Sequence, residues 1–253
     1  MAEFQSGGVR IAYDDVGGSG ARPVLLIHGF ASNRNENWRR MGWYGALERR
    51  GMRLVALDLR GHGESGKPHD AADYARETML GDIFALMDHL QIARADLFGY
   101  SMGARLALAA ALAKPDRVGD LILGGVGGRL FDPPPAGTAM ADAMRADNPD
   151  AITEPLLRSF RQFADEQGED RLALAACSKS AGADVTRADL AMLKPHTLVV
   201  AGAGDALAGD PDVLAAAMPD ARAVVLLGCN HFSAIPHALF KAAVFDFLDG
   251  EMG

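Results

Sequence analysis

The sequence predicts an α/β protein with a mostly parallel central sheet, helices on both faces and a small helical insertion. Strand-like and helix-like segments alternate from residue 23 onward, as in parallel sheets with crossover helices. Several strand segments are continuous apolar runs, which is typical of strands covered on both faces. The alternation stops between residues 127 and about 193, where helical patterns occur without a convincing strand.

Each element is predicted from its local pattern. Residues 9–13 alternate in side-chain character before a glycine-rich turn, which predicts an edge strand and an antiparallel start. Apolar runs predict the core strands at 23–27, 53–57, 95–98, 118–126, 197–201 and 223–227. Apolar residues at three- and four-residue intervals predict helices at 38–50, 78–90, 102–114 and 239–248.

The break in the alternation predicts two structural parts. Residues 1–126 and 194–253 are expected to form the α/β core, and residues 127–193 a helical cap, or lid, with helices at 136–146 and 153–166. Most apolar side chains of these helices are expected to form the core of the cap, and one or two to line a pocket. These side chains are Met140, Met144, Leu156, Leu157, Phe160 and Phe163.

Composition indicates the class of partner. The chain has 253 residues, 49% of them hydrophobic, and a net charge of −8 without a basic cluster, which argues against nucleic acid and anionic membranes. A small-molecule substrate is therefore expected. Cys177 and Cys229 occur singly, and no targeting or membrane-spanning segment is evident, so we expect a cytoplasmic protein. Composition leaves monomer and homodimer open.

Ser101 is the strongest candidate for a catalytic residue. It occupies the centre of Gly99-Tyr100-Ser101-Met102-Gly103, between an apolar strand and an Ala/Leu-rich helix. A side chain held out on a sharp strand-to-helix turn needs neighbours without Cβ atoms, and glycine meets that need on both sides. The N–H of Met102 opens the helix, so it is available to stabilise negative charge during acyl transfer.

Three further features follow apolar strands and are expected at the same edge of the sheet. They are His28-Gly29-Phe30, Asp205 and His231. A serine hydroxyl needs a base such as histidine, and a carboxylate fixes the tautomer of that histidine. We predict a Ser101–His231–Asp205 triad.

Other residues compete for the same roles. Asp210 and Asp212 are alternatives for the acid, and His237 is an alternative for the base. Asp205 is preferred because it lies closest to the strand end, and His237 follows a proline at a probable helix start. His28 and His62 are expected to stabilise their tight turns by hydrogen bonds rather than to transfer protons.

These motifs resemble those of the α/β-hydrolase family over most of the chain. His28-Gly29-Phe30 resembles the family's H-G-x turn, residues 58–65 its D-x-R-G-x-G-x-S loop, and residues 99–103 its nucleophile elbow. Residues 202–205 resemble the acid turn and 230–232 the base loop. The resemblance implies that Phe30 and Met102 provide the two oxyanion N–H groups.

The base loop departs from the family pattern at one position. Asn230 stands where the family commonly has glycine, so we expect Asn230 to adopt a left-handed backbone conformation. No metal or organic cofactor is implied, and no cluster of ligands in the sequence suggests one.

The resulting functional prediction is a serine hydrolase that cleaves carboxylic esters through an acyl-enzyme at Ser101. The Met- and Phe-bearing cap indicates an apolar substrate of small to medium size. Thioesters, lactones, amides and carbon–carbon bonds remain open as targets.

Two alternatives accompany this prediction. Arg105 lies one helical turn after Ser101, where a buried guanidinium could bind a substrate carboxylate or form a structural ion pair. With Phe30 and Tyr100 as further substrate-binding candidates, this pattern is similar to that of the menaquinone-pathway lyase that makes 2-succinyl-6-hydroxy-2,4-cyclohexadiene-1-carboxylate. Carbon–carbon bond hydrolases of aromatic breakdown are also similar. The second alternative is a small-ligand receptor or signalling protein that retains the triad.

Overall fold

The computed structural model describes residues 2–18, 22–133, 137–179 and 185–250, and these residues form one eight-stranded sheet. The strand order is β1-β2-β4-β3-β5-β6-β7-β8. The pairs β1–β2 and β2–β4 are antiparallel, and all other neighbouring pairs are parallel. The predicted α/β class and its mostly parallel sheet are confirmed. The strands are β1 (Ala2–Ser6), β2 (Val9–Val16), β3 (Val24–Ile27), β4 (Leu54–Leu57), β5 (Ala95–Tyr100), β6 (Val118–Gly124), β7 (Thr197–Gly202) and β8 (Ala221–Leu226).

The N-terminal edge differs from the sequence prediction. Ala2–Ser6 forms a strand of its own, so β2 lies between β1 and β4 instead of at the edge of the sheet. Gly7 and Gly8 join the two strands with φ of 55° and 81°. Two successive residues with positive φ make the tight turn of a two-residue hairpin. The Gly7-Gly8 pair is the sequence feature from which this hairpin could have been predicted.

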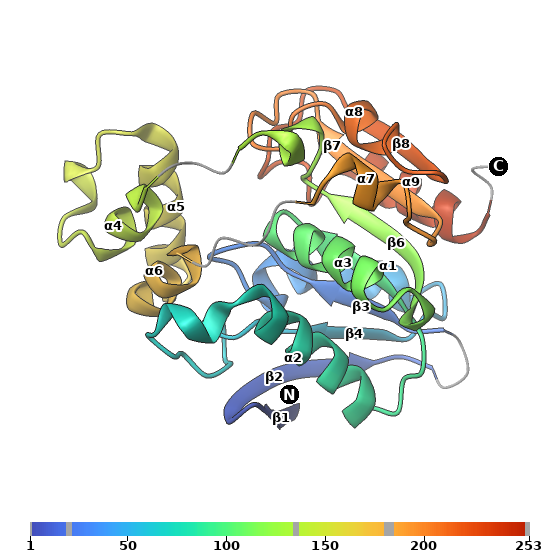
Figure 1. Cartoon of the computed structure of the whole chain (residues 1–253), viewed down its shortest axis with the longest axis horizontal. Coiled ribbons are helices and arrows are strands. Elements are labelled where there is room, and N and C mark those ends of the chain that lie inside the picture. The colour runs from blue at the N-terminus through green and yellow to red at the C-terminus, as the bar shows by residue number, and fades with distance from the viewer. Residues whose placement is uncertain (1, 19–21, 134–136, 180–184, 251–253) are drawn as a thin grey trace.

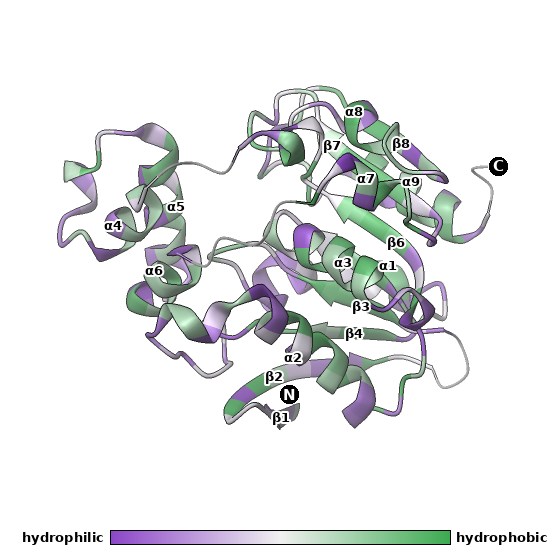
Figure 2. Ribbon diagram, viewed as in Figure 1, coloured by the Kyte–Doolittle hydropathy of each residue, from purple (hydrophilic) through white to green (hydrophobic). Residues whose placement is uncertain are grey.

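Helices cover both faces of the sheet (Figure 1). The main helices of the core are α1 (Trp43–Glu48), α2 (Arg76–His89), α3 (Met102–Ala113), α7 (Arg187–Leu190), α8 (Pro211–Ala215) and α9 (Ala238–Leu248). One face of the sheet packs against α2, α3 and α8, and the other against α1 and α9. In Figure 2, β3 and β4 are coloured as hydrophobic, in agreement with their complete burial.

The helix predicted at 38–50 is interrupted. A short π-helix, η1 (Asn35–Arg39), comes first, and α1 begins only at Trp43. Gly42 separates them with φ of 78°, a left-handed conformation that a continuous right-handed helix does not contain. The break lets Trp38 and Trp43 both reach the core, where each is fully buried beside Phe98.

The inserted segment contains α4 (Ala139–Arg145), α5 (Pro155–Glu166) and α6 (Arg171–Lys179), grouped at one end of the molecule (Figure 1). Residue 136, the predicted start of the first helix, lies outside the described residues. The three helices share a small apolar cluster that includes Met144, Phe160 and Leu174. Leu190 and Leu193, near the end of the segment, pack instead into the main core. None of the described helices has the length and apolarity needed to cross a lipid bilayer.

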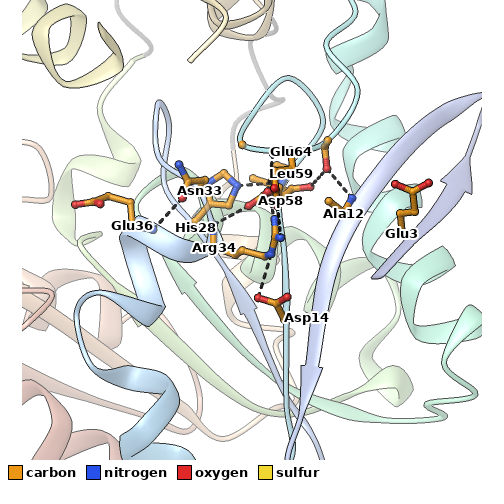
Figure 3. Close-up of polar contacts among 12 residues, drawn as sticks. Glu3, Ala12, Asp14, His28, Asn33, Arg34, Glu36, Asp58, Leu59 and Glu64 are labelled. Carbon is orange, nitrogen blue, oxygen red and sulfur yellow. Dashed lines mark hydrogen bonds and ion pairs between the residues drawn. The ribbon is translucent and has the colours of Figure 1, made fainter. Parts of the chain in front are cut away.

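A buried ionic network fixes the loops behind the predicted site (Figure 3). Arg34, 6% exposed, donates to Asp58, to Asp14 at 3.1 Å and to Glu64. Burial raises the pKa of Asp58, and the charge of Arg34 offsets part of that rise. Because Arg34 follows β3 and Asp58 follows β4, the network joins the loops at the ends of two neighbouring strands. It lines a polar cavity of about 490 Å³.

Candidate active site

Ser101 stands on a sharp turn between β5 and α3. Its backbone has φ of 54° and ψ of −113°, a strained conformation for a residue with a side chain. A Cβ atom at Gly99 would lie 2.2 Å from the carbonyl oxygen of Gly103, and one at Gly103 would lie 2.0 Å from that of Ile27. Both positions therefore require glycine, and the turn leaves Ser101 partly exposed.

The structure brings Ser101, His231 and Asp205 into one hydrogen-bonded chain. His231 Nε2 lies 3.0 Å from Ser101 Oγ, and His231 Nδ1 lies 2.8 Å from Asp205 Oδ2. The other oxygen of Asp205 accepts the N–H groups of Leu207 and Ala208 at 3.0 and 2.9 Å. Asp205 is 4% exposed, and its carboxylate accepts the hydrogen bond from His231 Nδ1. His231 therefore carries its proton on Nδ1, and Nε2 is free to accept the serine proton.

The competing residues have structural roles. Asp210 caps the start of α8, where its side chain accepts the N–H of Asp212 at 2.9 Å. His237 caps the start of α9 and accepts the N–H of Leu239 at 3.3 Å. Each of these caps satisfies a backbone donor that has no partner within its helix.

A hydrogen bond from Tyr100 holds the loop that carries His231. Tyr100, 2% exposed, donates its phenol O–H to the carbonyl of His231 at 2.5 Å. Burial raises the pKa of Tyr100, so the phenol stays a neutral donor. Tyr100 thus supports the base loop from the apolar layer below and does not line the open side of the site as its substrate-binding prediction requires.

Asn230 also differs from its prediction. The described non-glycine residues with positive φ are Ala31, Gln91 and Ser101, so Asn230 is not left-handed. Its side-chain oxygen accepts the N–H groups of Phe232 and Ser233, both at 3.0 Å. The asparagine therefore stabilises the turn with its side chain, a common way for this residue to replace a backbone contact.

The peptide between Gly29 and Phe30 is oriented by His28. His28 Nε2 accepts the N–H of Leu59 at 3.0 Å, so Nδ1 carries the proton and donates to the carbonyl of Gly29 at 2.8 Å. In a trans peptide the N–H points opposite to the C=O. The N–H of Phe30 consequently points away from the His28 ring.

Two backbone donors are available beside Ser101. No hydrogen bond within the described residues uses the N–H of Phe30 or of Met102. Gly29 lies against the nucleophile, since a Cβ atom there would be 3.4 Å from Ser101 Cβ. Backbone N–H groups without partners near a nucleophile form the arrangement that an oxyanion hole needs.

His28 and His62 are kept neutral by burial. Desolvation lowers the pKa of His28 to about 4 and that of His62 to about 3. A neutral His28 has one donor and one acceptor, which its two hydrogen bonds require. Protonation of His28 would remove the acceptor for Leu59 and so disturb the Gly29–Phe30 peptide.

Arg105 lies on an exposed part of α3. The carboxylate-anchor hypothesis expects a buried guanidinium, and Arg105 is exposed, so the expected burial is wrong while its substrate-binding role stays a prediction. The fourth residue after Ser101 does share its helical face, but this face of α3 reaches solvent at Arg105.

Aromatic side chains of the cap lie over the two active-site loops. Phe160 contacts Phe30 and Phe232, with ring centroids 6.0 and 5.9 Å apart. Phe163 contacts Phe232 at 6.2 Å. The cap therefore borders the site with apolar surface. Among the described residues, no group of three or more His, Cys, Asp or Glu side chains could hold a metal ion.

A family model described as "alpha/beta hydrolase fold" matches residues 22–175, which is more than half of the chain. The chain belongs to this family. The enol-lactonase from Burkholderia xenovorans LB400, a solved structure of similar alpha/beta hydrolase architecture, superposes with a TM-score of 0.81. It is 26% identical and covers 98% of this chain and 100% of its own.

Two sequence relatives of this alpha/beta hydrolase family member differ in activity. The dihydrolipoyllysine-residue acetyltransferase component of an acetoin cleaving system of Pseudomonas putida is 33% identical over 239 residues, 89% of this chain and 62% of that protein. A putative 2-succinyl-6-hydroxy-2,4-cyclohexadiene-1-carboxylate synthase of Bacillus subtilis (strain 168) is 33% identical over 118 residues, 47% of this chain and 41% of that protein. The chain thus spans less than two thirds of the length of both relatives.

Two residues near the site were missed by the sequence analysis. Asn37 accepts the N–H of Gly29 at 3.1 Å, and Glu169 of the cap accepts the N–H of Gly63 at 2.9 Å and a side-chain N–H of Asn33 at 3.0 Å. Neither residue belongs to a motif; the Asn37 contact depends on the fold of the loop after β3, and the Glu169 contacts on packing between distant segments. No sequence signal marked them.

We expect Gly103→Ala to destabilise the protein, because the added methyl group would overlap the carbonyls of Ile27 and His28. The loss of stability should be about 1–3 kcal/mol, as for other overpacked sites. Gly81→Ala is the matched control, since that position on α2 is exposed and has nothing within 4 Å of a new Cβ. Urea unfolding of both variants measures the difference; equal stability would contradict the close approach.

The two buried histidines should make stability depend on pH. Below about pH 6.5 the unfolded chain protonates them while the folded protein does not, so the unfolding free energy should fall as pH decreases toward 4. Each histidine adds a slope of up to about 1.4 kcal/mol per pH unit. His62→Gln should reduce the slope between pH 6.5 and 5, measured by urea unfolding. The exposed His69→Gln is the matched control, and an unchanged slope in His62→Gln would contradict the interpretation.

Proposed function

We propose that the protein is a serine hydrolase that cleaves carboxylic esters of small to medium apolar substrates through an acyl-enzyme at Ser101. The observation that carries this proposal is the chain of short contacts from Ser101 through His231 to Asp205. The unused N–H groups of Phe30 and Met102 beside it support the same chemistry. Such a set can both activate a hydroxyl and stabilise a tetrahedral oxyanion.

Each group has a definite part in the proposed reaction. Ser101 Oγ attacks the ester carbonyl while His231 Nε2 takes its proton, and the N–H groups of Phe30 and Met102 stabilise the oxyanion. His231 then gives this proton to the leaving alcohol, which forms the acyl-enzyme. Water, activated by the same histidine, releases the acid. Asp205 keeps His231 in the required tautomer and stabilises the imidazolium.

The surroundings of the site support an apolar ester. Phe30, Phe160 and Phe232 meet above the loops of the triad, so the cap offers apolar surface to the substrate. The similar structure from Burkholderia xenovorans is an enol-lactonase, and a lactone is a cyclic ester. Ring opening of a lactone would use the same attack, oxyanion and proton transfer.

A second candidate is a lyase or carbon–carbon bond hydrolase that acts on a carboxylate-bearing substrate. The match to the Bacillus subtilis synthase favours it. Arg105, the expected carboxylate anchor of this candidate, is exposed instead of buried, and solvent screening weakens a carboxylate contact at such a position. The ester hydrolase is therefore preferred.

Turnover of p-nitrophenyl esters from acetate to palmitate tests the proposed function. Esters with short to medium chains should be hydrolysed, and Ser101→Ala should lose at least about 10⁴-fold in kcat, because the serine and its base act as a unit. Circular dichroism checks that the variant folds. A folded wild-type protein that hydrolyses none of these esters, or a variant that keeps its activity, would contradict the proposal. Labelling by a fluorophosphonate with only a single turnover would favour the receptor alternative.

Arg105→Ala distinguishes the two candidate functions. If Arg105 has a structural role, its substitution should change the KM values for acidic and neutral esters by less than about threefold. If Arg105 binds a carboxylate bidentately, its loss should raise KM for acidic substrates alone by about tenfold or more. Steady-state kinetics with one acidic and one neutral ester of equal length measure the difference. A selective rise in KM would restore the lyase candidate.

A further inference from the structure

A cleft of about 410 Å³ lies between the cap and the core, and its lining includes Phe232, the residue after His231. Its wall on the cap side is formed by residues of α5, namely Ser159, Gln162, Phe163 and Glu166. The spacing of three, four and seven residues places these side chains on one face of the helix. We name this space the cap cleft. Its volume is in the range of small-molecule sites.

The core side of the cap cleft comes from the loops that carry the catalytic groups. Phe232 and Ile235 line it and follow His231 directly along the chain. Asn37 also lines it and holds the N–H of Gly29 in the loop of Phe30. The cleft is thus built from the neighbours of the proposed base and of the proposed oxyanion donor.

Asn37 leaves a polar group for a ligand. Its oxygen accepts the N–H of Gly29, which identifies the remaining atom of the amide as the donor Nδ2. Asn37 is 3% exposed, and Nδ2 has no hydrogen-bond partner among the described residues. A buried donor without a partner is rare in proteins, and a small shift of the Asn37 side chain toward the cap cleft would bring Nδ2 within reach of a substrate oxygen.

The charges of the cap cleft have one sign. Its ionisable lining residues are Glu36 and Glu166, and none of the described residues that line it is lysine, arginine or histidine. Arg40 pairs with Glu36 at 2.7 Å and offsets part of its charge, but Arg40 is 62% exposed and faces solvent. A carboxylate entering the cleft would meet Glu166 and the partly neutralised Glu36, and no cation lines the cleft among the described residues.

The position of the cap cleft relative to His231 determines which part of an ester would enter the cleft. His231 must deliver its proton to the departing alcohol, so the alcohol lies on the histidine side of the carbonyl. Phe232, whose ring centroid lies 5.7 Å from that of His231, lines the cap cleft and supports a position of the cleft on that side.

We propose that the cap cleft is the subsite for the alcohol part of the ester, and that it accepts neutral or cationic alcohols and rejects alcohols that carry a carboxylate. This inference rests on the proposed esterase function and deepens it. Selection comes from like-charge repulsion by Glu36 and Glu166, while Met41, Phe163 and Phe232 supply apolar contact for the alcohol's carbon atoms.

Three butyrate esters of similar size test the charge selection. Their alcohols are 3,3-dimethylbutanol (neutral), choline (cationic) and 4-hydroxybutanoate (anionic), and hydrolysis is followed by pH-stat titration at low ionic strength. We expect kcat/KM of the choline ester to equal or exceed that of the neutral ester, and kcat/KM of the anionic ester to be at least about tenfold lower. Added salt should reduce both differences.

Substitutions assign the selection to the cap cleft. Glu36→Gln/Glu166→Gln should raise kcat/KM of the anionic ester relative to the neutral ester by about fivefold or more. Glu166→Gln alone, at an exposed position, should give part of this change if the double variant folds poorly. Glu48→Gln on α1 is the matched control, since it removes an exposed carboxylate outside the cleft and should leave the ratio unchanged.

The outcomes separate this inference from the proposed function. Hydrolysis of the neutral ester with no discrimination by charge, or discrimination that the glutamine variants do not alter, would overturn the charge-selective subsite and leave the esterase intact. Failure to hydrolyse all three esters, together with no labelling of Ser101 by a fluorophosphonate, would overturn both. Discrimination that the variants reduce supports the inference.

Discussion

The candidate site depends on the close approach of the β5–α3 turn to the end of β3. Gly103 lies against the carbonyls of Ile27 and His28, at a distance that leaves no room for a side chain. This contact sets Ser101 beside the loop of Phe30, so the nucleophile and a backbone donor are placed by one packing constraint. The strain in the Ser101 backbone is maintained because β5, the strand that precedes it, is fully buried.

Desolvation gives the buried polar groups their functions. His28 is buried and therefore stays neutral, which allows it to orient the Gly29–Phe30 peptide with one donor and one acceptor. Tyr100 is buried and stays protonated, which allows it to donate to the carbonyl of His231. In both cases an apolar layer beneath the site controls the backbone that borders the substrate, without contact between the controlling side chain and the reacting atoms.

In the proposed function, the cap adds substrate selection to a catalytic set that is general for acyl transfer. Its aromatic contacts with Phe30 and Phe232 join it to both active-site loops, and Glu169 ties it to the loop after β4 through Gly63. One face of α5 then closes a cleft whose ionisable groups are acidic. Electrostatic repulsion acts over several ångströms, so two carboxylates at a rim can discriminate between substrates that the triad treats alike.

The sequence by itself determined the α/β class, the order of strands β2 to β8 along the chain, and the candidates Ser101, Asp205 and His231, because apolar runs and turn glycines are local signals. Only the tertiary structure decided the β1 hairpin's place in the sheet, the break at Gly42, the buried role of Tyr100 and the exposure of Arg105. It alone disclosed Asn37 and the cap cleft. These features depend on which distant segments pack together and which side chains lose contact with water, and a local pattern contains neither.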